Sequence, residues 1–301
     1  MRLGGFFRAN TIDALEPLCE KLDRHGLSAI PAPATGQSMS DDDAAAFGDK
    51  ARTLDMVVGE WGFWSNLMIH DSAERDHRIG QLRVILKKAD VMGVPCVMSL
   101  VGTRDASDHP LAPHPYMFTE ACQTEFREVV LRILDGLDLT STHYAIEPWC
   151  NTFFYQPEDI LPFIERVDHP RFGLHLDQMN MVSFKDFYHT IDLINRTFNL
   201  LKEFVCSVHL KDIRWDFEHM FLKWDEVYVG DGVMDYATYL KQIAKLPADI
   251  PCYCEHMSEE RDYALNFARL HELAEKAGVT FLRRRRDEKK RRSDPNRRTT
   301  K

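Results

Sequence analysis

The chain has 301 residues, of which 44% are hydrophobic and 11% aromatic, and its formal net charge is −9. This composition excludes a fibrous or largely disordered protein, and no run of about 20 apolar residues could form a membrane-spanning helix. The negative charge argues against a general nucleic-acid binder. Residues 1–5 lack the apolar region of a secretory signal, and the seven cysteines suit a reducing compartment, so we expect a cytoplasmic protein.

Short apolar runs alternate with amphipathic segments along most of the chain. The runs are rich in β-branched and aromatic residues, which is typical of strands, and they cover residues 3–7, 27–31, 56–61, 95–101, 143–149, 172–177, 206–210 and 251–255. The segments between them predict helices over residues 11–25, 41–54, 72–92, 118–137, 157–167, 184–204, 236–246 and 259–276. Three of these helices are followed by a glycine, which is a common stop signal: Gly26, Gly93 and Gly278.

Eight strands that are each followed by a helix predict parallel pairing through right-handed crossovers. Eight such units in about 280 residues fit a closed α/β barrel, the (β/α)8 or TIM barrel, as a single domain over residues 1–282. The alternative is an open doubly wound sheet, which usually carries a G-x-G-x-x-G loop after its first strand. Gly4 and Gly5 are followed by two phenylalanines and do not match that pattern.

The end of the chain has a different composition. Residues 283–301 contain 11 Lys and Arg against three Asp and Glu, so they carry +8 and the rest of the chain carries −17. Because this segment has no apolar face, we expect a disordered basic tail over residues 283–301. Nuclear targeting, nucleic-acid tethering and a solvated tail without function all remain open for it.

In a barrel of this type the chemistry takes place where the strands end. Each of the last four predicted strands has a potential metal ligand at its carboxyl end: Glu147, Asp177, His209 and Glu255. Four ionisable groups at one rim are costly to bury unless their charge is compensated. Three carboxylates and one imidazole suit Mn²⁺ or Mg²⁺, with Co²⁺ or Zn²⁺ as alternatives.

The alternation of side chains along a strand tests this hypothesis. Successive residues point to opposite faces, so if Glu255 points into the barrel, Tyr253 does too, while Cys252 and Cys254 face the helices. The cysteines are therefore poor candidates for ligands. In the other three strands the neighbours of opposite parity are apolar, as a helix-facing side requires: Ile146, Leu174, Leu176, Val208 and Leu210.

Five short motifs carry a resemblance to a known family: Ile146-Glu147-Pro148, Gly173-Leu174-His175-Leu176-Asp177, His209-Leu210-Lys211-Asp212, Gly230-Asp231-Gly232-Val233-Met234-Asp235-Tyr236 and Glu255-His256. With them the chain resembles, from residue 3 to about 281, the sugar phosphate isomerase/epimerase superfamily of xylose-isomerase-like barrels. That superfamily includes ketose 3-epimerases and inosose-processing enzymes. The resemblance implies that Glu147, Asp177, His209 and Glu255 bind one divalent metal, usually manganese. It also implies that Glu147 and Glu255 form the catalytic acid/base pair.

The sequence departs from the ketose 3-epimerases at two substrate-binding positions, where it has Asn180 instead of His and Phe153 instead of Glu. A free ketose is therefore less well supported as substrate than metal chemistry in general. The weaker candidates for substrate binding are His175, Asn180, Lys211 and Arg214. Aromatic loops at residues 61–64 and 215–224, and the proline-rich loop 104–116, are expected to cover the site.

The expected function is that of a metal-dependent sugar, cyclitol or keto-sugar isomerase or epimerase in carbohydrate metabolism. It would remove a proton next to a carbonyl through a metal-stabilised enediolate. A lyase or dehydratase acting on a keto-sugar or 3-keto-glycoside is the alternative, and a DNA-repair endonuclease or a non-catalytic barrel is less favoured. The expected partner is a small carbohydrate, with no membrane or nucleic acid, and a homo-oligomer remains open because dimers and tetramers are common in this superfamily.

Overall fold

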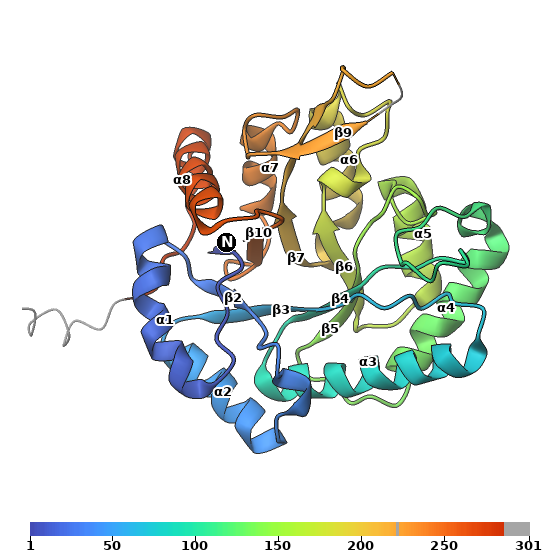
Figure 1. The fold of residues 1–301 in the computed structure, drawn as a ribbon, viewed down its shortest axis with the longest axis horizontal. Helices are drawn as coiled ribbons and strands as arrows, with labels where there is room; N and C mark the ends of the chain where they lie inside the picture. The colour runs from blue at the N-terminus through green and yellow to red at the C-terminus, as the bar shows by residue number, and fades with distance from the viewer. Residues whose placement is uncertain (221–222, 286–301) are drawn as a thin grey trace, which may run out of the picture.

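The computed structural model describes residues 1–220 and 223–285. Its strands form a closed barrel in the order β1, β10, β7, β6, β5, β4, β3, β2, and every neighbouring pair around it is parallel. The bounds are β1 (Arg2–Gly4), β2 (Ala29–Pro31), β3 (Val57–Phe63), β4 (Cys96–Ser99), β5 (His143–Ile146), β6 (Phe172–Asp177), β7 (Val205–Leu210) and β10 (Pro251–Cys254). Because β1 pairs with β10, the sheet is closed (Figure 1), and the open doubly wound alternative is excluded.

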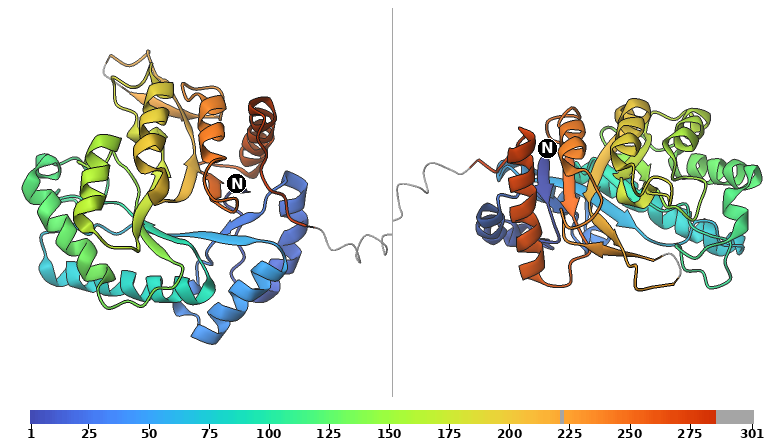
Figure 2. Two further views of the ribbon diagram at one scale, coloured as in Figure 1. Left: turned by 180° about the vertical axis from the view of Figure 1, so that it is seen from behind. Right: turned by 90° about the horizontal axis from the view of Figure 1, so that it is seen from above.

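In the part of the chain that the structure describes, eight α-helices follow the strands, and Figure 2 shows helices on the outside of the barrel from two further directions. They are α1 (Ile12–His25), α2 (Asp41–Thr53), α3 (Ser72–Met92), α4 (Glu120–Leu134), α5 (Pro157–Val167), α6 (Thr190–Leu201), α7 (Tyr236–Ile243) and α8 (Glu260–Ala277). Gly26, Gly93 and Gly278 end α1, α3 and α8 with φ between 67° and 82°. A residue without a Cβ adopts this left-handed conformation at little cost, so the predicted stop signals are confirmed.

Two predicted helices begin later than expected. The segment predicted as a helix from residue 184 is irregular until α6 begins at Thr190. There the Ser183 hydroxyl accepts from the Asp186 amide at 3.3 Å and donates to the Asp186 carboxylate at 2.5 Å, and such local bonds compete with helix formation. Similarly, residues Pro115–Phe118 form a 3-10 helix, and the Thr119 hydroxyl caps α4 by accepting from the Cys122 amide at 3.1 Å.

A hairpin that the sequence did not predict follows β7. Its strands β8 (Asp212–Trp215) and β9 (Trp224–Val227) pair antiparallel and form a separate two-stranded sheet next to the barrel (Figure 1). Phe187 packs against it, with ring centroids 5.6 Å from Trp215 and 5.3 Å from Trp224. The aromatic residues of the predicted loop 215–224 therefore hold this hairpin on the barrel.

The two faces of the strands separate as predicted. Residues of one parity belong to the core between strands and helices, among them Ile146, Leu174, Leu176, Val208 and Leu210. Cys252 and Cys254 belong to the same core, and Asn266 of α8 donates to the Cys254 sulfur at 3.5 Å. The inner face of the barrel carries a smaller apolar layer of Cys96, Met98 and Ala145.

The predicted basic tail lies almost entirely outside the described residues, which end at Arg285. The division of the chain at residue 282 remains a prediction. In the described part, Arg284 pairs with Asp23 at 3.1 Å, and the Arg285 amide donates to Asp55 at 2.6 Å. None of the helices in the described ranges is long and apolar enough to cross a membrane.

Candidate active site and metal centre

The structure brings the four predicted metal ligands together at the carboxyl end of the barrel. Asp177 is the last residue of β6 and is paired in register with His209 of β7, while Glu147 and Glu255 directly follow β5 and β10. One potential ligand atom from each of the four lies within 4.8 Å of the others. Parallel strands in register deliver these side chains to one level of the barrel, which explains why residues so far apart in the chain meet there.

His209 lies at the centre of this cluster. Its Nδ1 atom is 2.8 Å from Glu255 Oε1, 3.6 Å from Asp177 Oδ2 and 3.8 Å from Glu147 Oε1. Lys211, two residues further along, places its Nζ atom 2.5 Å from Asp177 Oδ2 and 2.6 Å from Glu255 Oε1. Three carboxylates therefore surround one imidazole and one ammonium group in a buried site.

Hydrogen bonds from the segment after β6 orient two of the carboxylates, those of Asp177 and Glu147. Asp177 Oδ1 accepts from the backbone amides of Met179 and Asn180 at 3.1 and 3.2 Å, so that Oδ2 faces the cluster. The Asn180 amide group also donates to Glu147 Oε1 at 2.8 Å. Asn180, predicted as a substrate contact, thus orients one of the proposed ligands.

The chemistry of these residues fits a divalent cation. Asp177 Oδ2, His209 Nδ1 and Glu255 Oε1 are buried and make no hydrogen bond of good geometry. Binding of a cation at His209 Nδ1 requires a neutral imidazole, which leaves Lys211 as the cation nearest to the carboxylates of Asp177 and Glu255. Three carboxylates converge here on one lysine and one histidine. Such a set of buried oxygen and nitrogen atoms is what an oxygen-rich site for a divalent cation requires.

The pKa values of Glu147 and Glu255 are shifted in opposite directions. Burial raises the pKa of Glu147 above its usual range, although His209 and Lys211 oppose this shift. Burial would also raise the pKa of Glu255, but His209 and Lys211 outweigh it and hold that pKa well below its usual value. Burial lowers the pKa of His209 less than the neighbouring Glu255 and Glu60 carboxylates raise it.

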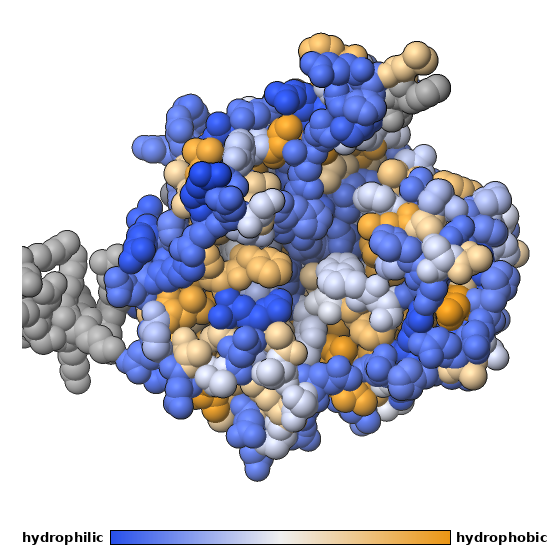
Figure 3. All heavy atoms as spheres, in the orientation of Figure 1, coloured by the Kyte–Doolittle hydropathy of each residue, from blue (hydrophilic) through white to orange (hydrophobic). Residues whose placement is uncertain are grey.

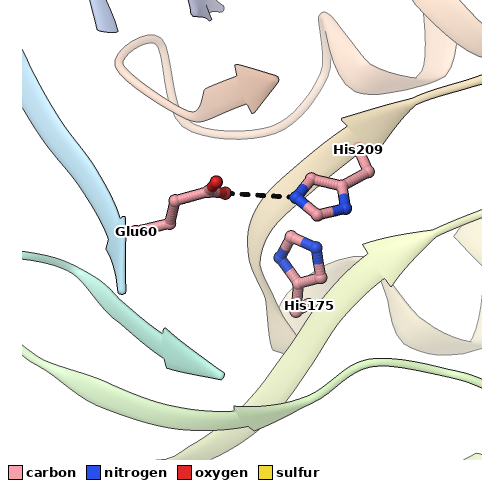
Figure 4. A group of neighbouring side chains, drawn as sticks. All are labelled: Glu60, His175 and His209. Carbon is pink, nitrogen blue, oxygen red and sulfur yellow. Dashed lines mark ion pairs between the residues drawn. The ribbon is translucent and has the colours of Figure 1, made fainter. Parts of the chain in front are cut away.

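Glu60 also belongs to the site, although the strand pattern did not predict a role for it. It comes from β3, is 9% exposed, and places Oε2 3.4 Å from Nε2 of His209, on the ring edge opposite the cluster (Figure 4). His175 lies beside them, with its ring centroid 4.0 Å from that of His209 and its Nδ1 hydrogen-bonded to the Ser207 hydroxyl. A glutamate in the middle of a predicted apolar strand, Val57-Val58-Gly59-Glu60-Trp61, was the signal that could have revealed it.

Two cavities open beside the cluster. One, of about 650 Å³, is lined by Glu147, Lys211 and Glu255 on one side and by mostly apolar residues on the other, which include Trp64, Leu100, Leu111, Trp149, Ile213 and Trp224. The other, of about 460 Å³, is reached by Arg8, Glu60, His209 and Tyr253. Figure 3 shows this face hollowed at its centre, with hydrophilic surface inside and hydrophobic residues around part of the rim. The loops at 61–64, 104–116 and 215–224 all contribute to these walls, as predicted.

A larger cavity of about 1320 Å³ lies at the opposite end of the barrel, among residues such as Arg2, Asp55 and Asp249. None of the four clustered side chains lines it. Since the amino ends of barrel strands serve stability and not chemistry, we place the site at the smaller cavities.

The remaining predicted substrate contacts are distributed unevenly. Lys211 and Asn180 line the 650 Å³ cavity, whereas His175 is fully buried in the barrel interior and lines neither cavity. Arg214 is exposed on β8 and lines a separate hollow with Glu226 and Met257. His256 connects the two regions, because its ring lies 3.6 Å from Glu255 and 2.9 Å from Glu226 of the hairpin.

Asp212 explains why two of the motifs occur together. Its carboxylate accepts from the backbone amides of Ile213, Gly230, Gly232 and Met234 at 2.9–3.1 Å. A Cβ at position 232 would lie 2.2 Å from Asp212 Oδ1, so only glycine fits there. The aspartate after Lys211 and the glycine-rich segment before α7 therefore form one structural unit beside the site.

The chain is similar to a known protein family and to several solved structures. Residues 12–284 match the model of a family described as xylose isomerase-like TIM barrel. No curated protein matches the sequence. A xylose isomerase-like TIM barrel protein from Mycobacterium smegmatis in complex with magnesium has 16% identity and a TM-score of 0.62, and the match covers 88% of this chain and 90% of that one.

Two further structures differ in the activity they are named for. The 3-keto-D-glucoside 4-epimerase YcjR from E. coli has 14% identity and a TM-score of 0.64, over 91% of this chain and 99% of that one. The probable 3-DHS dehydratase AsbF from Bacillus anthracis has 15% identity and a TM-score of 0.62, over 85% of this chain and 92% of that one. At these identities the likeness concerns the fold.

Proposed function

The chain belongs to the family of xylose isomerase-like TIM barrels, and from this premise we propose that it is a divalent-metal-dependent isomerase or epimerase of a carbohydrate. One observation carries the proposal: the ligand atoms of Glu147, Asp177, His209 and Glu255 converge within 4.8 Å at the carboxyl end of the barrel. The structure named as a 3-keto-D-glucoside 4-epimerase supports this choice of reaction. A cytoplasmic location remains part of the proposal, and the seven free cysteines agree with it.

We propose that Glu147, Asp177, His209 and Glu255 hold the cation, with Mn²⁺ as the first choice and Mg²⁺, Co²⁺ or Zn²⁺ as alternatives. The magnesium complex of the mycobacterial neighbour supports a divalent ion at this kind of site. When bound, the cation supplies electrophilic stabilisation of the negative charge that develops beside a carbonyl when a proton leaves. Its identity and that of the sugar are open to experiment.

Glu147 and Glu255 are the proposed acid/base pair. They follow β5 and β10, which are separated by β6 and β7 around the barrel, so they approach the cavity from well-separated parts of its rim. One carboxylate takes the proton from the carbon next to the carbonyl. If the other returns a proton to the opposite face, the carbon is inverted. If a proton returns to the neighbouring carbon and the hydroxyl proton passes from one oxygen to the other, an aldose and a ketose interconvert. Asn180 orients Glu147, and Lys211 is placed to bind a sugar oxygen.

Substitution of either glutamate tests this assignment. Glu147→Gln and Glu255→Gln should each reduce turnover by about 10²–10⁴-fold, because proton transfer by a positioned group contributes that much. Activity is measured on a panel of keto-sugars with added Mn²⁺, Mg²⁺ or Co²⁺ in D₂O, where deuterium in a rearranged product marks the reaction. Glu165→Gln, at the opposite end of the barrel, is the matched control. Near-normal turnover of either glutamine variant would remove it from the acid/base pair.

A lyase or dehydratase is the second candidate, and the apolar cavity is the observation that favours it. Removal of the same proton from a sugar that carries a leaving group on the next carbon leads to elimination. A cavity of about 650 Å³ with Trp64, Trp149 and Trp224 in its walls is in the range that takes a drug-sized ligand, which suits a keto-glycoside with an apolar aglycone. The dehydratase neighbour supports this reaction type. Release of phenol from phenyl 3-keto-β-D-glucoside, with formation of an enone, would establish the lyase.

A further inference from the structure

We propose that Glu60 is a positioning residue for His209: its carboxylate accepts the Nε2–H of the imidazole and thereby presents the Nδ1 lone pair to the cation. The inference rests on the proposed metal site and extends it to a residue outside the four ligands. It starts from the arrangement in Figure 4, where Glu60 reaches from β3 across the barrel towards His209 of β7.

The two ring nitrogens of His209 have different neighbours, and Glu60 contacts only one of them. His209 is 2% exposed, and its two ring nitrogens face opposite surroundings, with Nδ1 towards Asp177 and Glu255 and Nε2 towards Glu60. Among the described residues, Glu60 Oε2 and both ring nitrogens of His209 are buried and make no hydrogen bond of good geometry. The 3.4 Å between Glu60 Oε2 and His209 Nε2 is longer than a good hydrogen bond, and such contacts are often long before a site is loaded.

The chemistry of imidazole gives this contact a direction. A neutral imidazole carries one N–H, so the nitrogen that donates decides which nitrogen can bind a metal. A carboxylate at Nε2 favours the tautomer in which Nδ1 carries the free lone pair. Histidine ligands usually donate their other N–H to a carboxylate or carbonyl, which also fixes the ring orientation.

The Glu60 carboxylate is buried, so it needs a partner for its charge. Burial raises the pKa of Glu60, and His209 is the neighbour that most strongly lowers it again. Arg8 adds a weaker attraction, and no ion pair to Glu60 other than that of His209 is present among the described residues. A buried carboxylate without a partner is costly. The contact of Glu60 with the metal-binding His209 therefore has to offset the cost of burying Glu60.

Glu60, His175 and His209 could instead hold a second cation, because their ligand atoms also lie within 4.8 Å of one another. We favour the positioning role because His209 would have to lose both ring protons to bind one cation through Nδ1 and another through Nε2. The two arrangements predict different numbers of bound ions.

Calorimetric titration with Mn²⁺ at one fixed pH measures both the number of ions bound and the dissociation constant. We expect one ion per wild-type chain and a 10–100-fold higher dissociation constant for Glu60→Ala, the range for loss of such an outer partner. Glu60→Gln should fall between the two, because its carbonyl oxygen still accepts the Nε2–H. Glu165→Gln, at the opposite end of the barrel, should bind Mn²⁺ like the wild type.

The Mn²⁺ electron paramagnetic resonance spectrum gives an independent readout, which should broaden or change shape in Glu60→Ala and be largely restored in Glu60→Gln. Circular dichroism of each variant checks that the barrel is folded. Equal dissociation constants for wild type and Glu60→Ala would overturn the inference alone. Two ions in the wild type and one in Glu60→Ala would replace it with a second cation site. A wild type that binds no Mn²⁺, Mg²⁺ or Co²⁺ would overturn the proposed function together with it.

Discussion

Lys211 occupies a position that a bound cation would have to share. Its ammonium group lies 2.5 Å from Asp177 Oδ2 and 2.6 Å from Glu255 Oε1, and both oxygens also face the proposed metal position. Burial lowers the pKa of this lysine less than the surrounding carboxylates, Asp177 first among them, raise it, so it stays charged. This ammonium group therefore contributes strongly to the stability of the cluster before metal binding.

Replacement of this ammonium should make the protein depend on metal for its stability. Lys211→Met should lower the free energy of unfolding by roughly 3–5 kcal/mol, because it leaves buried carboxylates unpaired. Saturating Mn²⁺ should recover part of this loss, since an ion that binds only the folded state stabilises it. Urea unfolding with and without Mn²⁺ measures both effects.

Lys88→Met is the matched control, because Lys88 is also buried and pairs with Asp41 away from the site. Its partner Asp41 is largely exposed, so Lys88→Met should be destabilised less than Lys211→Met. Mn²⁺ should not narrow its difference from the wild type. Equal stabilisation of wild type and Lys211→Met by Mn²⁺ would show that the lysine does not compensate the same charges as the cation.

At the scale of elements, the segment that connects β4 to α4 forms one wall of the apolar cavity and is held by a charged network. Glu125 of α4 accepts from Arg75 at 2.6 Å, from the Tyr116 hydroxyl at 2.8 Å and from Arg104. Burial would raise the pKa of Glu125, but these donors, Arg104 first, outweigh it and lower the pKa to about 2. The loop is thus attached to the barrel through an ionised carboxylate.

This attachment predicts a pH-dependent contribution to stability. Because the folded pKa is below the unfolded one, the contribution is complete above about pH 4.5 and is lost as the pH falls towards 2. Glu125→Gln should cost about 1–2 kcal/mol at pH 7, a value reduced for solvent screening of this partly exposed group. Urea unfolding at pH 7, 5 and 3 should show the difference from wild type shrinking only at the lowest pH. A constant difference across this range would contradict the ionised network.

For the whole molecule, the end of the described chain helps to hold the start of the barrel. The Leu282 amide donates to the Met1 carbonyl at 2.8 Å, and Arg284 reaches Asp23 at the end of α1. Arg285 reaches Asp55, which also pairs with Arg2 of β1 at 3.0 Å. The first residues of the basic segment are therefore part of the contacts around the barrel's closing strand.

Two truncations separate these contacts from the remaining basic residues. A chain that ends at Leu282 should lose about 1–3 kcal/mol of unfolding free energy, since it lacks the charged hydrogen bonds of Arg284 and Arg285. A chain that ends at Arg285 should match the full length, because the composition of residues 286–301 offers no apolar side chains to bury. Thermal and urea unfolding of both truncations against the full chain measure this. Equal stability of the two truncations would assign no role to the arginines.

Periodicity and strand parity were enough to predict the barrel and the four clustered residues, because both follow from local rules. The alternation of strands and helices sets the topology. The period of two along a strand decides that Glu255 points inwards while Cys254 points towards α8, as the contact of Cys254 with Asn266 confirms. The position of Asp177 at a strand end could also be predicted, because the strand and the turn after it are adjacent in the sequence.

Contacts between distant segments were decided only by the tertiary structure. Glu60 belongs to the site because closure of the barrel places β3 opposite β7, and Asp212 binds the amides of residues 230–234 because the chain returns through an unpredicted hairpin. α6 begins only at Thr190 because Ser183 and Asp186 form side-chain hydrogen bonds before it. A pattern of apolar residues does not predict such bonds. The sequence by itself thus determined which residues meet at the carboxyl end of the strands, since local alternation aims them there. The partners that orient those residues depend on closure of the sheet, which no local pattern encodes.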